Sequence, residues 1–329
     1  MSALSAKHFH DEKAAFRYVE SRIWPNGPVC PHCGGFERIG ALKGKSTRLG
    51  VYKCYQCRKP FTVKVGTIFE SSHVPLRVWL QAIFLMAGSK KGISSNQLSR
   101  ALSVTVKTAW FMSHRIREAM RAGDLAPFGS NCGAVEVDET FYGRNKQDPY
   151  IKGRKAYHHL NKVLSLVDRD SGRVRSYVVD DLKISTIAPI LEQNISREAR
   201  LMTDEAVFYK SLGWNFAEHG VVNHSHDEYV KADDVTIHTN TIEGYFSIFK
   251  RGMRGVYQHC DKKHLHRYAA EFDFRYSNRI ATGCDDAERA DRILDGAVGK
   301  RLTYQTTRCK GPAFAWKEGY TWPQSERRN

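Results

Sequence analysis

The 329-residue sequence contains no run of 18 apolar residues, so it predicts no membrane-spanning helix. Its opening residues, MSALSAKHFHDEKAAF, become charged before the apolar core of a signal peptide could form, which argues against secretion. Acidic residues are missing from one long stretch: Arg38 to Lys64 holds eight basic residues and no Asp or Glu. These absences favour a cytoplasmic protein with a basic N-terminal half.

The positive charge is concentrated in the first part of the chain. The formal net charge is +16, and residues 1–125 contain 20 Lys and Arg against 7 Asp and Glu. A solvated surface usually mixes both signs, so an excess of this size indicates a polyanionic partner. Nucleic acid is the first candidate, and an anionic membrane surface is the alternative that charge alone leaves open.

Four of the eight cysteines form two close pairs, Cys30 with Cys33 and Cys54 with Cys57, in the pattern C-x2-C-x20-C-x2-C. Two such knuckles supply the four thiolates of a tetrahedral Zn2+ site, and four thiolates leave no open position for water. The segment between the pairs is expected to form two short strands and a turn. The pattern therefore predicts a structural zinc ribbon. Two redox-active pairs are the alternative.

The segment from residue 74 to residue 120 shows no strand-like alternation, and its pattern predicts three helices, at about 75–87, 94–102 and 105–121. Ser94 or Ser95 is expected to cap the second helix, and Thr105 the third. A basic outward face on the third helix is typical of a helix-turn-helix that reads the major groove. That face comprises Lys107, Thr108, His114, Arg115 and Arg117. A plain three-helix packing unit is the alternative, because Ser103 stands where the turn usually has glycine.

Strands are expected to begin at AVEVDETFYG (134–143), which alternates strictly, with Glu136 and Asp138 on its polar side. Residues 158–181 are interpreted as two strands joined by RDSG, followed by a helix, a short strand at 199–206, and a long helix from about Thr241. This order fits an α/β RNase H-like (retroviral-integrase-like) catalytic domain. The predicted domains are 1–70 (N-terminal helix and zinc ribbon), 71–125 (helix-turn-helix), 126–280 (RNase H-like catalytic domain) and 281–329 (C-terminal helix and tail, docked on the catalytic domain or on a partner subunit).

In that architecture an aspartate on the first strand, another ending the fourth and a carboxylate on a later helix come together. Here those positions are Asp138, Asp204 and Glu243. Three converging carboxylates repel one another unless cations lie between them, which is the arrangement that two Mg2+ ions require. A solvated helix residue is the alternative for Glu243, and Asp180 and Asp181 are weaker rivals for the strand position.

The zinc ribbon, the predicted helix-turn-helix, VEVDETFYG, LMTDEA and HTNTIEGYFSIFKRGMRGVY followed by HLHRYAAEFDFRYSNR together resemble the ISXO-like group of DDE insertion-sequence transposases. The resemblance covers residues 10–310. It implies cutting and joining at the ends of a mobile element with Mg2+ or Mn2+, with Asp138, Asp204 and Glu243 as catalytic residues and a downstream basic residue at Lys250. Asn240, three residues before Glu243, is the second candidate for the third metal ligand.

The resemblance also implies double-stranded DNA as partner, at the element ends and the target, a homodimer or higher oligomer on that DNA, and a nucleoid-associated chain. Arg251 and Arg254, beside Lys250, are expected to contact phosphates. Two further functions remain open. One is a non-catalytic zinc-ribbon DNA-binding regulator, and the other is an RNase H-type nuclease acting on RNA–DNA hybrids.

Overall fold

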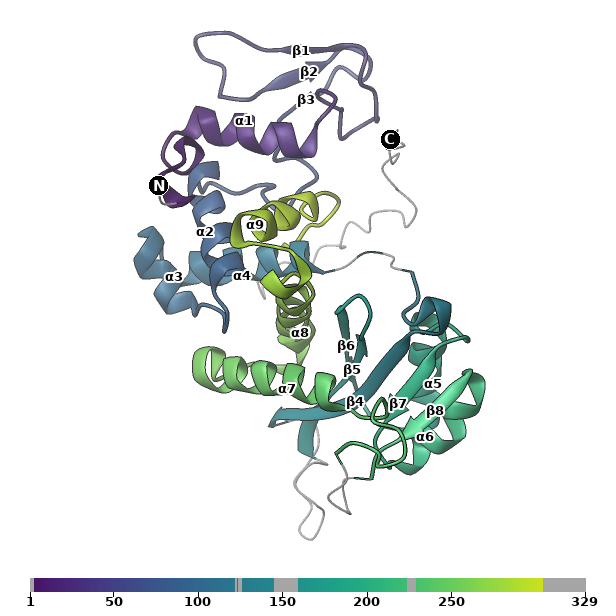
Figure 1. The fold of residues 1–329 in the computed structure, drawn as a ribbon. Coiled ribbons are helices and arrows are strands. Elements are labelled where there is room, and N and C mark those ends of the chain that lie inside the picture. Colours follow the sequence, from purple (N-terminus) through teal and green to yellow (C-terminus); the bar gives the residue numbers. More distant parts are fainter. Residues whose placement is uncertain (1–2, 122, 124–125, 145–158, 224–228, 304–329) are drawn as a thin grey trace.

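The computed structural model describes residues 3–121, 123, 126–144, 159–223 and 229–303. Figure 1 shows the zinc-ribbon segment and a group of helices on one side, and a sheet flanked by helices on the other. The tail predicted beyond residue 303 lies outside the described residues. Across the described part of the chain, every helix is too short or too polar to cross a membrane.

The N-terminal segment starts with the 3-10 turns Ala3–Ser5 and Lys7–Phe9 and continues into α1, Glu12–Ile23. The Asp11 side chain accepts a hydrogen bond from the Ala14 N–H and caps α1, which places the helix where the sequence predicted one. Three antiparallel strands follow in the order β1-β2-β3. The first two, β1 Ile39–Ala41 and β2 Tyr52–Cys54, are the two strands predicted from the segment between the cysteine pairs, and β3 Pro60–Phe61 follows the second pair.

The next helices, α2 Leu76–Gly88, α3 Ser95–Leu102 and α4 Val106–Met120, match the three predicted from the sequence. Ser94 accepts from the Gln97 N–H and Thr105 from the Thr108 N–H, so both predicted caps are formed. Ser103 between α3 and α4 has φ +52°, the left-handed conformation that glycine normally takes at a helix end.

Helix α9, Asp286–Asp295, lies far along the chain but packs against α2, α1 and α4. Its Ile293 and Leu294 belong to the same apolar core as α1, the ribbon and α2 to α4. The C-terminal helix therefore packs on the N-terminal helices, where docking on the catalytic domain or a partner subunit was expected. Figure 1 shows α9, in yellow, beside α2 and α4.

A five-stranded mixed sheet forms the second half, in the order β6-β5-β4-β7-β8. Strands β4, β5 and β6 pair antiparallel, whereas β7 and β8 run parallel to β4. The strands are β4 Ala134–Arg144, β5 Leu160–Asp168, β6 Val174–Val179, β7 Arg200–Thr203 and β8 Glu218–Val221. The predicted hairpin and the predicted strand before residue 204 are both present.

Helices cover both faces of this sheet. The odd-numbered residues Val135 and Val137 of β4 pack with α5 Ile184–Asn194 and α6 Val207–Leu212, while the opposite face packs with α7 Asn240–Gly252 and α8 Lys262–Ser277. Helix α7 continues into a π-helical turn, Met253–Tyr257. Short 3-10 turns occupy Ser130–Cys132, Gly213–Asn215 and Ile280–Thr282. Helix α8 contacts both β6 and α4, so it joins the two halves.

Candidate active site and zinc site

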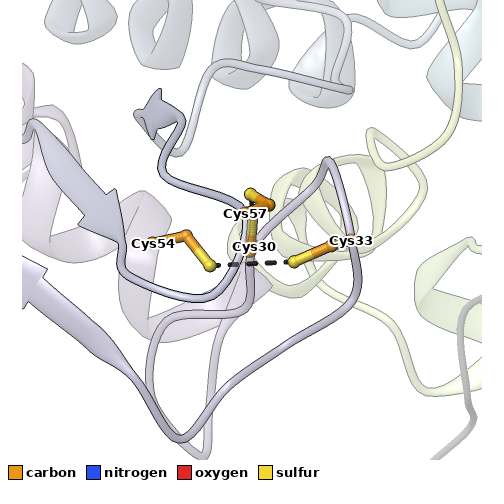
Figure 2. A group of neighbouring side chains, drawn as sticks. All are labelled: Cys30, Cys33, Cys54 and Cys57. Atoms are coloured by element: carbon orange, nitrogen blue, oxygen red, sulfur yellow. Dashed lines mark hydrogen bonds between the residues drawn. The ribbon is translucent and has the colours of Figure 1, made fainter.

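The four predicted zinc ligands come together in the ribbon (Figure 2). The Sγ atoms of Cys30 and Cys57 lie 3.6 Å apart, and those of Cys33 and Cys54 lie 3.7 Å apart. Zn–S bonds of about 2.3 Å in a tetrahedron require sulfur separations of about 3.8 Å. The four thiols therefore have the spacing of a closed Zn2+ site with no coordination position left for water.

The backbone turns tightly at both knuckles and lowers the pKa of one of the four thiols. Gly34 and Arg58, each directly after the second cysteine of a pair, have φ near +75° and +64°, which turns the chain tightly at both knuckles. Backbone N–H donation at Cys57 is the largest cause that lowers the pKa of the Cys54 thiol, to about 7. A thiolate is the form that binds zinc, so this donation favours the ligand state.

Three carboxyl groups form a second cluster on the sheet. Oxygens of Asp138, Glu139 and Asp204 all lie within 4.8 Å of one another. Residues Ala134 to Glu136 of β4 pair with Arg200 to Met202 of β7, and the same register continued by two residues brings Asp138 beside Asp204. The Ala206 N–H donates to Asp204 at 3.1 Å, which orients this side chain immediately after β7.

Burial and the repulsion of neighbouring carboxylates make two of these groups, Asp138 and Glu139, unusually weak acids. Burial, followed by the charges of Glu139 and Asp204, raises the pKa of Asp138 to about 8. Burial, followed by the charge of Asp204, raises the pKa of Glu139 to about 7. Oxygen ligands at this spacing fit a hard divalent cation, which would take the place of the protons. The donor set of three carboxylates suits a divalent cation.

Glu139 is the member of this cluster that sequence reasoning missed. Alternation along β4 directs Glu139 to the face opposite Asp138, so the pattern gave no reason to group them. In the structure the Tyr209 hydroxyl of α6, which is fully buried, donates to Glu139 Oε2 at 3.0 Å. The Glu139 N–H donates to Asp138 at 2.7 Å. The adjacent acidic pair in VEVDET was the available signal.

Glu243 lies at the edge of this cluster, in the first turn of α7. Its charge also raises the pKa of Asp138, by less than burial and the charges of Glu139 and Asp204 do. Ile242, Phe246 and Phe249, spaced at i, i+4 and i+7 along α7, are buried, and Glu243 is half-buried beside them. Asn240, one turn earlier, is exposed.

The weaker rivals lie elsewhere. Asp180 follows β6, two strands away from β4, and accepts from Lys262 Nζ at 2.6 Å. Asp181 accepts from the Lys183 N–H and from the Thr186 hydroxyl at the start of α5. Both carboxylates are engaged at the edge of the sheet rather than in the cluster.

Three residues predicted to contact DNA are inside the protein, and for them the prediction of an outward face is wrong. His114, Arg115 and Arg117 are 0%, 5% and 1% exposed. Arg117 donates to Glu271 of α8 at 2.6 Å, while Arg115 donates to the carbonyls of Ile68 and Glu70 and to that of Leu302. Residues from distant parts of the chain cover this face of α4, which the sequence pattern had predicted to be exposed.

The other predicted DNA contacts lie at or near the surface. Lys107 is exposed in the first turn of α4, and Thr108 is half-buried with its hydroxyl 2.9 Å from that of Thr105. Arg251 and Arg254 are exposed, and Lys250 is half-buried with Nζ 6.0 Å from the Phe246 ring centroid. Whether these residues contact DNA remains a prediction.

Comparisons with known proteins agree with both sites. Residues 132–277 match the ISXO2-like transposase domain, and residues 10–60 match the transposase zinc-ribbon domain. A Halobacterium salinarum protein described as an uncharacterized protein in transposable element ISH50 is 29% identical over 286 residues, covering 82% of this chain and 92% of that protein.

A solved structure of the simian T-cell lymphotropic virus intasome in complex with PP2A regulatory subunit B56 gamma overlaps more weakly. The overlap covers 59% of this chain and 65% of that one, with 12% identity and a TM-score of 0.27, and it carries no conclusion.

The chain therefore combines a four-cysteine ribbon, which matches the transposase zinc-ribbon domain, with a mixed sheet that bears a cluster of carboxylates. The sheet domain is similar to ISXO2-like transposase domains, and the chain has a relative encoded in an insertion element.

Proposed function

We propose that this chain binds the terminal inverted repeats of its mobile element, cleaves DNA strands there and joins them to a target, with Mg2+ or Mn2+ as cofactor. One observation supports this most strongly. Three carboxyl groups have oxygens within 4.8 Å of one another, and burial and repulsion raise the pKa of Asp138 to about 8. A fold tolerates such a cluster when its function is to hold cations.

Each carboxylate has a separate task in this proposal. Asp138 and Asp204, from adjacent strands, bind the divalent ions, and Glu243 completes the set from α7. Glu139, held by Tyr209, supplies a further oxygen within 4.8 Å of oxygens of both aspartates. Divalent ions held by these residues would supply activation of the attacking water or 3′-hydroxyl and stabilisation of charge on the phosphate. Lys250, two turns beyond Glu243, is on the same side of α7 and would contact a phosphate.

The sheet order supports an RNase H-like architecture for residues 126–280. Strands β4, β5 and β6 pair antiparallel, and β7 and β8 run parallel to β4. The acidic residues lie on β4 and directly after β7. Helices α3 and α4, joined through Ser103, would form the helix-turn-helix with Lys107 at its DNA-facing end. The basic ribbon would contact the same DNA. Because transposition holds two element ends together, two or more copies would assemble there.

Asp138→Asn tests this proposal, with Asp180→Asn as the matched control. The control makes the same chemical change at an exposed aspartate outside the cluster. Zinc-loaded chains would be given paired element-end DNA and Mg2+ or Mn2+, and DNA binding measured separately without these ions. We expect Asp138→Asn to bind DNA normally and lose cleavage and strand transfer, while Asp180→Asn retains both.

Two outcomes would contradict the proposal. Strand transfer by Asp138→Asn would mean that the site is wrong. A wild-type chain that binds the ends but neither cleaves nor joins them would instead be a non-catalytic regulator. Glu243→Gln and Asn240→Ala in the same assay identify the third ligand, and we expect the Glu243 change to be the more damaging one.

A further inference from the structure

Glu136 is a fully buried carboxylate that the proposed chemistry does not use. It precedes Asp138 by two residues, so both side chains point to the α7 face of β4. Its exposed fraction is 0%, and its Oε2 accepts a hydrogen bond from the Ile242 N–H at 2.8 Å. That N–H belongs to the first turn of α7, where helix N–H groups lack a partner within the helix.

The other oxygen of Glu136, Oε1, forms an ion pair with the Arg169 side chain. Arg169 Nε, in the turn between β5 and β6, donates to Glu136 Oε1 at 2.6 Å, and His238 Nδ1 is 3.3 Å from the same atom. The Arg169 guanidinium also donates to the carbonyl oxygens of Thr236 and His238 at 2.6 Å. One ion pair therefore joins β4, a sheet turn, the segment before α7 and α7 itself.

Helix α7 is fixed at its other end from the same face of β4. The Tyr142 hydroxyl lies 3.1 Å from the Met253 carbonyl and 3.0 Å from that of Gln258. The span from Ile242 to Met253 is about 16 Å of helix, and Glu136 to Tyr142 is about 20 Å of strand, so helix and strand run side by side between the two anchors. Asp138 lies between these anchors, and Glu243 follows the residue that Glu136 holds.

We propose that Glu136, paired with Arg169, is a positioning residue that fixes the start of α7 so that Glu243 faces the carboxylates of β4 and β7. This inference rests on the proposed function, because it assigns Glu136 a role in divalent-metal affinity. Glu136 itself does not contact the metal, because its two oxygens accept hydrogen bonds from Arg169 and from the Ile242 N–H. Loss of an outer partner that orients a ligand typically weakens metal binding by about 10–100-fold.

Glu271 provides a matched control. It is also 0% exposed and also paired with an arginine, Arg117, at 2.6 Å, but it lies between α8 and α4. Glu136→Gln and Glu271→Gln each neutralise a buried, paired glutamate, so both should lower the melting temperature. A role confined to stability predicts the same metal affinity for the two variants.

The experiment measures Mn2+ affinity of the zinc-loaded full chain by electron paramagnetic resonance of free Mn2+, together with the melting temperature. We expect Glu136→Gln to weaken Mn2+ binding about 10–100-fold and Glu271→Gln to leave it within about twofold. Arg169→Lys is the second variant. It keeps the positive charge but cannot reach Glu136 and both carbonyls at once, so positioning predicts weaker binding.

The possible outcomes distinguish a failure of this inference from a failure of the proposed function. If Glu136→Gln weakens binding but Arg169→Lys does not, the effect is one of charge and the inference is overturned. Equal affinities for Glu136→Gln, Glu271→Gln and wild type overturn it as well. If Glu136→Gln does not fold, unchanged affinity in Arg169→Lys is enough to reject it. Absence of Mn2+ binding by the wild type contradicts the proposed function itself.

Discussion

The acidic cluster should make the metal-free chain less stable as the pH rises. The folded-state pKa of Asp138 is raised to about 8, from 3.8 as the ordinary value. Between these pH values the native chain holds a proton that the unfolded chain has released. The free energy of unfolding then falls by about 1.4 kcal/mol for each pH unit. The contribution is complete below pH 3.8 and is lost as the pH approaches 8.

Between pH 5 and pH 7 this slope gives a loss of about 2–3 kcal/mol from Asp138 alone. Glu139, whose pKa burial raises to about 7, acts in the same direction. The two groups interact, so their losses do not simply add. The figure is an upper value because a flexible site relaxes around a new charge. It is still large against a total stability of about 5–15 kcal/mol.

Urea unfolding at pH 5, 6 and 7, with zinc bound and without Mg2+ or Mn2+, measures this loss. Asp138→Asn supplies the reference, because the amide has nearly the same shape and does not titrate. We expect the stability of the wild type relative to this variant to fall by about 2–3 kcal/mol from pH 5 to pH 7, and Mg2+ to restore it. Parallel curves for the two chains would refute the reasoning that Asp138 is held protonated by burial and its neighbours.

Two further predictions concern the N-terminal half. Arg117→Met should lower the free energy of unfolding by about 1–3 kcal/mol, because buried Glu271 loses one partner but keeps Arg275 and Tyr257, whereas Lys107→Met should change it by less than about 0.5 kcal/mol. If both variants changed the free energy of unfolding by similarly small amounts in urea, Arg117 would not form the buried ion pair that links α4 to α8. A zinc chelator, or Cys54→Ser, should unfold the ribbon and weaken element-end binding in a gel-shift titration, since structural zinc binding is coupled to folding. Unchanged binding after verified zinc loss would exclude that coupling.

Local signals were enough to predict most elements. The capping side chains Ser94 and Thr105 and the apolar spacing placed α3 and α4 within a residue or two of their observed ends. Strict alternation located β4, and RDSG located the turn between β5 and β6. These features depend on neighbours within about one turn or one pleat, so the sequence contains them in full.

Contacts between segments far apart in the chain were not predicted from the sequence. Arg115 and Arg117 looked like a basic outer face because the residues that bury them, Ile68 and Glu271 among others, are dozens to more than a hundred positions away. Residue type and helical spacing within α4 are the same whether an arginine is buried by a distant segment or exposed at the surface. The same limit hid the packing of α9 on α2.

The end of β7 explains how adjacent residues of β4 reach one site. Strand β7 pairs with β4 only from Ala134 to Glu136, and within the described residues β4 then continues beside β5 alone. Beyond Glu136 the strand edge is therefore open on the β7 side. Side chains from both faces can turn toward this gap, which is why Asp138 and Glu139 share a cluster although alternation separates them. A longer β7 would fill the gap with backbone hydrogen bonds, so the short strand is what leaves room for the carboxylates to gather there.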